Sequence, residues 1–487
     1  MLNSQVFEPV IGLEIHAQLL TKTKLFCGCS TQFGSPQNSL TCPVCLGLPG
    51  ALPVLNQKAV DMAIKFALAG NARVHLRSIF SRKNYFYPDL PKGYQITQFH
   101  FPMATNGFLS LDSNGNQKNV SIERIHLEED AGKSIHDGMP DSLTKTYLDF
   151  NRSGIPLLEI VGKPEISSPS EAVMFLQHVR TMLQYLEICD GNMEEGSLRC
   201  DANLSVRKKG SKKLSIKVEI KNLNSFRFLQ KALEYETRRQ VESLKENKAV
   251  IQETRFWDTR RNKTLPMRDK EEARDYRYFP EPDLSPLIIP KEHVKSIKET
   301  LPEFPQEKKA RFIRNYHISP YIAKILTSSK KLADYFEKTA KASQNPKQAS
   351  NWILREVLQH LKEAELDITQ FPILPENLAE LILAVEKKKI SVRAAKKEIF
   401  PVMLQSSEGI SAIIKKKRLR QISDEKKLEA IIRKILKENS KPLKQYLEGK
   451  AQIFEFFVGL IMRKTKSKAS PELVNKILRD ILDGHKK

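Results

Sequence analysis

The chain lacks any hydrophobic run long enough to cross a membrane. Its most apolar stretch, Ile453 to Met462, is short and contains Glu455, whereas a membrane helix needs roughly 18 or more consecutive apolar residues. The first residues also lack a basic segment followed by an apolar one, which is the pattern of a secretory signal. These absences predict a cytoplasmic protein with no membrane partner.

Cysteine is scarce, with six in 487 residues, too few for a disulfide scaffold in a chain of this length. Four of the six nevertheless form two closely spaced pairs, Cys27-Gly-Cys29 and Cys42-Pro-Val-Cys45. Two such turns can each supply two thiolates to one tetrahedral ion. Two inert buried pairs or a dithiol centre are the alternatives, and the spacing favours a structural zinc site.

Acidic residues are in deficit, with 57 Asp+Glu against 80 Lys+Arg and a net charge of +23. Residues 411–487 alone hold 21 Lys+Arg and 9 Asp+Glu. This excess predicts binding to a polyanion, because neutralised phosphates release counterions. Few aromatic residues interrupt the basic stretches at the C-terminus. Contact with the backbone of folded RNA is therefore favoured over stacking on single-stranded bases.

A strict alternation of apolar and polar residues runs from Ile11 to Leu19. A period of two predicts a strand with one buried face, and Glu14 and His16 lie on the other face. Two later segments, 198–206 and 214–220, alternate in the same way and place Asp201 and Glu219 on their polar faces. The third segment is expected to bury Ile216, Val218 and Ile220.

If these three strands are neighbours, their acids converge on one surface. Carboxylates with one imidazole suit Mg²⁺ or Mn²⁺, while the alternative is three sheet faces that simply meet water. Three basic residues alternate with the acids and could bind phosphate oxygens; they are Arg199, Lys217 and Lys221.

Three consecutive acids, Glu128-Glu129-Asp130, precede Ala-Gly-Lys133-Ser134. Adjacent carboxylates repel one another unless solvent or a cation separates them. The continuation resembles a loop that approaches phosphate, but it lacks the first glycine of a P-loop. A turn at 149–154 and a buried strand at 156–161 are expected to follow.

The remaining pattern predicts an α+β protein with helices concentrated in its second half. Asn56 and Gly70 are expected to bound one helix, and Ser168 with Glu171 forms the capping box of another. Further helices are predicted at 225–248, 301–315, 321–342, 349–366, 374–388 and 471–482. Proline residues near 290 suggest the end of a first domain, followed by helical domains at 291–410 and 411–487.

Six long segments in order resemble one family, the B subunits of the aspartyl/glutamyl-tRNA amidotransferases. They are Val10–His16, Arg82–Gln95, Leu127–Ser134, Glu194–Asn203, Glu219–Asn224 and Asp275–Asp283. The resemblance spans essentially the whole chain. It implies an antiparallel-sheet cradle domain at 1–290 like that of glutamine synthetase, an all-α domain, and a small basic tail domain like the stand-alone YqeY proteins.

The resemblance also implies a reaction and its partners. ATP phosphorylates the side-chain carboxylate of Glu-tRNA(Gln) or Asp-tRNA(Asn), and ammonia from the amidase, or A, subunit displaces the phosphate. A small C subunit joins the A and B subunits. The tail departs from the family at Glu455, where glycine is usual, and at Ser467–Ser470, so a tail helix is expected to pack differently.

The family's Mg²⁺ site corresponds to six residues of this chain, and its zinc site corresponds to the four paired cysteines. The six are Glu14, His16, Glu128, Glu129, Asp201 and Glu219. The expected ligands of the ATP phosphates are Lys133, Ser134, Arg152, Arg199, Lys217 and Lys221. Two other functions stay open, a tRNA-binding scaffold without catalysis and a free-standing amino-acid amide synthetase. The expected substrate is Glu-tRNA(Gln), Asp-tRNA(Asn) or both.

Overall fold

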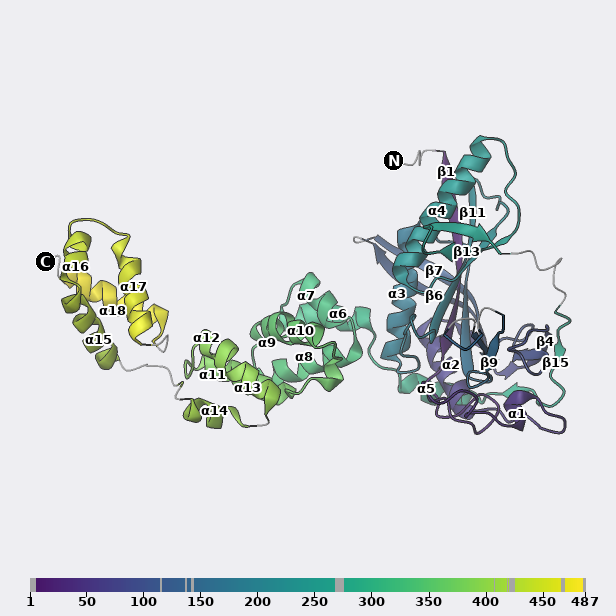
Figure 1. The fold of residues 1–487 in the computed structure, drawn as a ribbon, viewed down its shortest axis with the longest axis horizontal. Coiled ribbons are helices and arrows are strands. Elements are labelled where there is room, and N and C mark those ends of the chain that lie inside the picture. Colours follow the sequence, from purple (N-terminus) through teal and green to yellow (C-terminus); the bar gives the residue numbers. More distant parts are fainter. Residues whose placement is uncertain are drawn as a thin grey trace. The chain divides into compact units, whose positions relative to one another are not determined.

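The computed structural model describes residues 6–113, 116–135, 138–141, 144–267, 276–406, 408–417, 419, 425–465 and 469–484 (Figure 1). The chain divides into two compact units, Met1–Phe304 and Pro305–Lys487. Asp275 of the last family-like segment, and Ser467 and Lys468 of the tail, lie outside the described residues. In the part of the chain that is described, no helix has the length and apolar character needed to span a membrane.

A sheet of twelve strands forms the centre of the first unit, counted over the described residues. Its main order is β14-β13-β12-β11-β1-β10-β7-β5-β4-β15, and β6 joins β7 to β2. The pairing is antiparallel except between β12 and β13, which are parallel. The bounds are β1 (Phe7–Gln18), β2 (Arg73–Val74), β4 (Ser81–Asn84), β5 (Tyr94–Thr97), β6 (Ala104–Ser113), β7 (Asn116–Glu129), β10 (Pro156–Gly162), β11 (Leu198–Lys208), β12 (Val218–Lys221), β13 (Thr254–Asp258), β14 (Lys263–Pro266) and β15 (Phe279–Pro280).

Two short ribbons accompany this sheet. One pairs β3 (Arg77–Ser78) with β16 (Leu287–Ile288), and the other pairs β8 (Lys133–Ile135) with β9 (Tyr147–Asp149).

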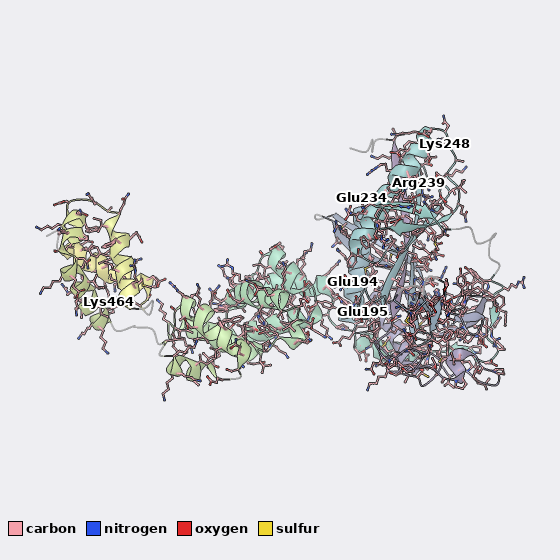
Figure 2. All side chains as sticks on the ribbon, viewed as in Figure 1. Glu194, Glu195, Glu234, Arg239, Lys248 and Lys464 are labelled. Carbon is pink, nitrogen blue, oxygen red and sulfur yellow. The ribbon has the colours of Figure 1, made fainter. Side chains whose placement is uncertain are left out.

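Helices pack on the apolar face of the sheet, where Ile11, Leu13 and Ile15 are completely buried. They are α2 (Gln57–Ala69), α3 (Pro169–Tyr185) and α4 (Phe226–Lys245), and Figure 1 shows α3 and α4 lying along the sheet. Helix α5 (Lys291–Glu299) packs against α2. Figure 2 labels Arg239 on α4. Its Nη2 donates to Oε1 of Glu253, just before β13, at 3.2 Å. The opposite face of β1 keeps its polar residues free of this core.

The capping residues predicted from the sequence mark the helix ends. The Asn56 side chain accepts a hydrogen bond from the Lys58 N–H at 2.9 Å, and α2 ends just before Gly70. Ser168 likewise accepts from the Glu171 N–H at 3.2 Å. The return bond of the capping box is made one residue earlier than predicted, because the Glu171 carboxylate accepts from the Ser167 N–H at 3.0 Å.

The strand predicted at 214–220 is wrong in its first half. Strand β12 begins at Val218, and Leu214 and Ile216 are about half exposed. The ladder with β11 ends at the pair Leu204 and Val218. Among the residues that the structure describes, no strand pairs with 214–217, so this segment does not extend the sheet and Ile216 stays about half exposed.

The second unit is helical, and two of its predicted helices are interrupted. The segment 321–342 breaks at Thr327, and Ser329 caps the next helix by accepting from the Leu332 N–H at 3.2 Å. The segment 349–366 includes a π-helical turn at Ile353–Val357. The helices are α6 (Pro305–Tyr316), α7 (Pro320–Leu326), α8 (Lys330–Ser343), α9 (Pro346–Trp352), α10 (Leu358–Glu363), α11 (Pro375–Glu386), α12 (Val392–Ala394), α13 (Phe400–Gln405) and α14 (Ile410–Lys416).

The last four helices share a separate core that includes Leu428, Phe457 and Leu478. They are α15 (Glu425–Glu438), α16 (Ser440–Leu447), α17 (Ile453–Lys464) and α18 (Pro471–Gly484). The structure thus has a sheet-rich part followed by helices, which confirms the α+β class. Helix α5 belongs to the first unit, where Ile297 joins the core. The finer division at residues 290 and 410 stays a prediction.

Candidate functional site

A row of polar side chains crosses the sheet on the face opposite the helices. Glu14 lies directly across from Asp201 on β11, and His16 lies across from Arg199. On the other side of β1, His16 faces Glu159 of β10. Strand β12 continues the row, with Glu219 paired to Asn203. The three strands whose polar faces carry the predicted acids are therefore consecutive neighbours, and Glu14, His16, Asp201 and Glu219 share one surface.

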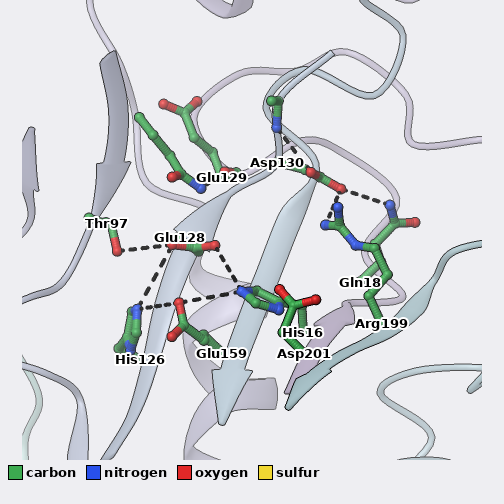
Figure 3. Close-up of polar contacts among 12 residues, drawn as sticks. His16, Gln18, Thr97, His126, Glu128, Glu129, Asp130, Glu159, Arg199 and Asp201 are labelled. Carbon is green, nitrogen blue, oxygen red and sulfur yellow. Dashed lines mark hydrogen bonds and ion pairs between the residues drawn. The ribbon is translucent and has the colours of Figure 1, made fainter. Parts of the chain in front are cut away.

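Three side chains in this row could hold a metal ion: His16, Glu128 and Glu159 each offer a ligand atom, and all three atoms lie within 4.8 Å of one another. His16 Nε2 is 3.5 Å from Glu159 Oε2 and 3.9 Å from Glu128 Oε1. His126 Nε2 approaches the same carboxylate oxygen of Glu159 at 3.1 Å (Figure 3). Burial disfavours charge on His126, but Glu159 and Glu128 together raise its pKa to about 9. Two carboxylates and two imidazoles thus meet in one buried cluster.

The neighbouring acids repel one another in the absence of a cation. Burial, followed by the charges of Glu159 and Glu219, raises the pKa of Glu14. Burial also raises the pKa of Asp201, although Lys221 opposes this shift. Lys221 Nζ lies 3.4 Å from Glu219 Oε1 and 3.8 Å from Asp201 Oδ2. A bound divalent cation would remove the repulsion that Lys221 only partly offsets.

The Glu129 side chain lies away from the other predicted metal ligands. Adjacent residues of a strand point to opposite faces, and Figure 3 shows the Glu129 side chain apart from that of Glu128. Glu129 forms an ion pair with Lys92 and accepts a hydrogen bond from the Ile96 N–H at 2.9 Å. It lines a cavity of about 190 Å³ together with Lys24 and Cys45.

Two of the predicted phosphate ligands converge on Asp130 instead of pointing freely into the site. Arg199 Nη2 donates to Asp130 Oδ2 at 2.9 Å, and Arg152 Nε lies 3.6 Å from the same oxygen. Gln18 also donates to it at 3.0 Å. Burial opposes ionisation of Asp130, but Arg199 and Arg152 lower its pKa below the ordinary value. This carboxylate therefore fixes both guanidinium groups beside the polar row.

The other predicted phosphate ligands occupy different places. Lys133 and Ser134 lie on β8, and Lys133 is exposed. Lys217 is exposed just before β12 begins. Only Lys221 of this group lies among the acids of the polar row, through its contacts with Asp201 and Glu219.

The four paired cysteines form a second cluster that could hold a metal ion, since their sulfur atoms all lie within 4.8 Å of one another. The isolated bridge between Thr23 and Ser30 closes the turn that carries Cys27 and Cys29. The short helix α1 (Pro43–Leu46) carries the other pair, with Cys42 at its N-cap. A hydrogen bond from Cys27 lowers the pKa of the Cys45 thiol to about 4. A lowered pKa favours the thiolate, the form of cysteine that binds metals.

Sequence analysis missed Glu159 and His126. Glu159 lies within a run of apolar residues, and every residue of β10 is buried, so the run predicted only a core strand. His126 does carry a signal: Arg124, His126 and Glu128 alternate with Ile125 and Leu127. That alternation predicts a polar face on β7 as it does on β1.

Comparison with known proteins identifies the class. Residues 9–295 match the family model described as the GatB/GatE catalytic domain, and residues 334–482 match the one described as the GatB domain. The first match contains the whole polar row and the cysteine cluster. The chain therefore combines the catalytic domain of a tRNA-dependent amidotransferase with that family's C-terminal helical region.

Relatives that match along nearly their whole length identify the family. Three curated proteins, each named as the B subunit of an aspartyl/glutamyl-tRNA(Asn/Gln) amidotransferase, are similar to this chain. The protein of Carboxydothermus hydrogenoformans is 51% identical, that of Chlorobaculum tepidum 50% and that of Thermotoga petrophila 49%. Each comparison covers 98% of this chain and at least 99% of the relative. The chain belongs to the family of aspartyl/glutamyl-tRNA(Asn/Gln) amidotransferase B subunits, whose members are carbon–nitrogen ligases.

Proposed function

We propose that the chain is the ATP-dependent component of a glutamine-dependent amidotransferase acting on Glu-tRNA(Gln), Asp-tRNA(Asn) or both. ATP phosphorylates the side-chain carboxylate of the amino acid on the tRNA. Ammonia from a partner amidase, the A subunit, then displaces the phosphate and leaves an amide. A small C subunit holds the two larger subunits together.

The observation that carries this proposal is the polar row on the face of the sheet opposite the helices. Its donors are carboxylate oxygens with imidazole nitrogen, a set that fits Mg²⁺ or Mn²⁺. His16, Glu128 and Glu159 would hold one ion, and Glu14, Asp201 and Glu219 lie on the same face to receive metal-bound nucleotide. Bound Mg²⁺ would neutralise phosphate charge during phosphoryl transfer.

The chain's own cations have defined roles in this arrangement. The Lys221 ammonium lies between Asp201 and Glu219, where it can pair with phosphate oxygens once a metal occupies the acids. Arg199 and Arg152 are oriented by Asp130, and orientation matters because a guanidinium recognises phosphate through a fixed fork of donors. Asp130 acts by positioning these arginines.

The same proposal includes the fold of the first unit, the cysteine cluster and the C-terminal tail. The first unit is a cradle related to glutamine synthetase, and the four cysteines hold a structural zinc ion. A Cys₄ set with short spacings, whose sulfur atoms lie within 4.8 Å of one another, suits zinc. Residues 411–487, with their excess of Lys and Arg, bind the tRNA backbone as a YqeY-like tail.

The competing function is a tRNA-binding scaffold without catalysis. A scaffold gives no reason for buried acids to gather at His16, where their repulsion is costly. In the assembled complex, Asp201→Ala or Glu219→Ala should abolish ADP formation while tRNA binding persists. Glu242→Ala, at an exposed position of α4, is the matched control and should leave both unchanged. Undiminished ADP formation in the first two variants would leave only the scaffold.

A second competitor is a free-standing amino-acid amide synthetase, which would act without tRNA. The net charge of +23 favours a polyanionic substrate instead. Incubation with free glutamate or aspartate, ATP and ammonia should give no amide. Supplying the assembled complex with each misacylated tRNA in turn then shows which of them it amidates.

A further inference from the structure

Lys24 is a buried lysine that the proposed chemistry leaves without a role. Its side chain is fully buried, with an exposed fraction of 0%. Its Nζ contacts Cys45 Sγ at 3.5 Å and the Phe150 carbonyl oxygen at 3.3 Å. A buried ammonium is strongly unfavourable unless a negative group compensates it. A metal ion at the cluster would hold Cys45 as a thiolate, and the 3.5 Å contact would then place the Lys24 amino group against that negative sulfur.

The second contact of Lys24, with the Phe150 carbonyl oxygen, is made to the loop 150–154. This loop is attached to the cysteine cluster, because Ser153 Oγ donates to the Cys45 carbonyl at 3.1 Å. It is also attached to the polar row, because the Gly154 N–H donates to the Asp130 carbonyl at 2.8 Å. Within the loop, Arg152 Nε donates to the Ala131 carbonyl at 3.0 Å.

We propose that Lys24 is a positioning residue that couples metal binding at the four cysteines to the loop carrying Arg152. Metal binding fixes Cys45, Lys24 follows the position of the Cys45 sulfur atom that it contacts, and the same amino group holds the Phe150 carbonyl. The loop in turn keeps Arg152 against Asp130, where Arg199 is also held. The effect on catalysis rests on the proposed function, whereas the coupling itself does not.

The first test compares the metal-loaded wild-type chain with the same chain after chelation, using hydrogen–deuterium exchange. Ser153 and Gly154 amides are bonded to the Phe150 and Asp130 carbonyls at 3.0 and 2.8 Å. They should exchange at least ~10-fold faster without metal, because their bonds open locally. The α3 peptides, remote from the loop in sequence, serve as the reference and should not change. Unchanged exchange in the loop would overturn the coupling.

The second test replaces Lys24 by methionine, which keeps the length of the side chain and removes its charge. Lys24→Met should weaken Co²⁺ binding at the cysteines by about 10–100-fold, the usual effect of losing a partner of a metal ligand, as measured by thiolate-to-cobalt absorption. Its loaded form should also show the fast loop exchange of the stripped wild type. Lys22→Met, at an exposed position two residues earlier, is the matched control.

Wild-type Co²⁺ affinity and wild-type loop protection in Lys24→Met would overturn the role of Lys24. If that variant fails to fold, exchange in the stripped wild type still decides the coupling. Neither readout involves ATP, tRNA or ammonia. A failure of the proposed function therefore leaves these results unaffected. Failure of either test here likewise leaves the proposed function unaffected.

Discussion

Glu14 on β1 and Asp201 on β11 face each other across two hydrogen-bonded strands, and burial raises the pKa of both carboxyl groups. The charges of Glu159 and Glu219 also raise the pKa of Glu14, and that of Glu219 raises the pKa of Asp201. This repulsion lowers the stability of the metal-free fold, and a cation bound among the acids would relieve it. Perturbed carboxyl groups of this kind are characteristic of functional sites.

The first prediction follows from that opposition. Glu14→Gln removes one of the repelling charges and keeps an oxygen to accept the Asn203 amide, which donates at 2.8 Å. The metal-free variant should unfold at a temperature about 2–4 °C higher than wild type, corresponding to about 1 kcal/mol. Its further stabilisation by Mg²⁺ should be smaller, since that stabilisation reflects binding to the folded state.

Thermal unfolding with and without Mg²⁺ measures both effects. Glu8→Gln, on the same strand, removes a contact with Arg207 at 2.8 Å and should leave the Mg²⁺ effect intact. A lower unfolding temperature for metal-free Glu14→Gln, with a full response to Mg²⁺, would contradict the predicted role of Glu14.

A second prediction concerns pH and the helical unit. The Arg311 guanidinium donates to Glu337 at 2.7 and 3.0 Å. These bonds, with one from Tyr316, lower the pKa of Glu337 to about 2 from an ordinary value of 4.5. A depressed folded-state pKa stabilises the fold above the unfolded value, and this contribution is lost as pH falls from about 4.5 toward 2. Glu337→Gln should therefore destabilise the unit at pH 7 and much less at pH 2.5.

Unfolding temperatures of wild type and Glu337→Gln at the two pH values provide the measurement. Glu380→Gln, at an exposed position of α11, is the control and should differ little from wild type at either pH. An equal difference between wild type and Glu337→Gln at both pH values would show that the ion pair contributes no stability.

Local sequence patterns predicted the strands and helix caps better than they predicted the site. The alternation in β1 and β11 placed Glu14, His16 and Asp201 on polar faces, and Asn56 marked the start of a helix. Such patterns depend on neighbouring residues alone. The prediction failed at Ile216, where the alternation continues but the described part of the chain places no paired strand beside it.

The composition of the candidate site depends on which strands pair and in what register. Glu159 lies beside His16 only because β10 pairs with β1. In the sequence, Glu159 lies within an apolar run, which predicts a core strand and not a functional site. The strand geometry also determines where Glu129 lies, a residue that the family resemblance implied as a ligand. Its side chain leaves the polar face because consecutive strand residues alternate, and it pairs with Lys92.

A third prediction concerns the tail. Deleting residues 411–487 removes 21 Lys+Arg and 9 Asp+Glu, and it should weaken tRNA binding by the complex. The dependence of log affinity on log salt concentration should become shallower by about one unit for each phosphate group that is no longer neutralised. Filter binding across a salt series measures the slope. An unchanged slope would refute tail contact with the tRNA backbone.

The most direct measurement of the central claim is Mn²⁺ binding to the chain, followed by electron paramagnetic resonance, in wild type and two variants. Glu159→Gln removes the carboxylate shared by His16 and His126, while Glu123→Gln changes a mostly exposed carboxylate on β7. Wild type and Glu123→Gln should bind Mn²⁺ equally, and Glu159→Gln should bind it at least ~10-fold more weakly. Equal Mn²⁺ binding by all three proteins would contradict a metal site on the polar face of the sheet.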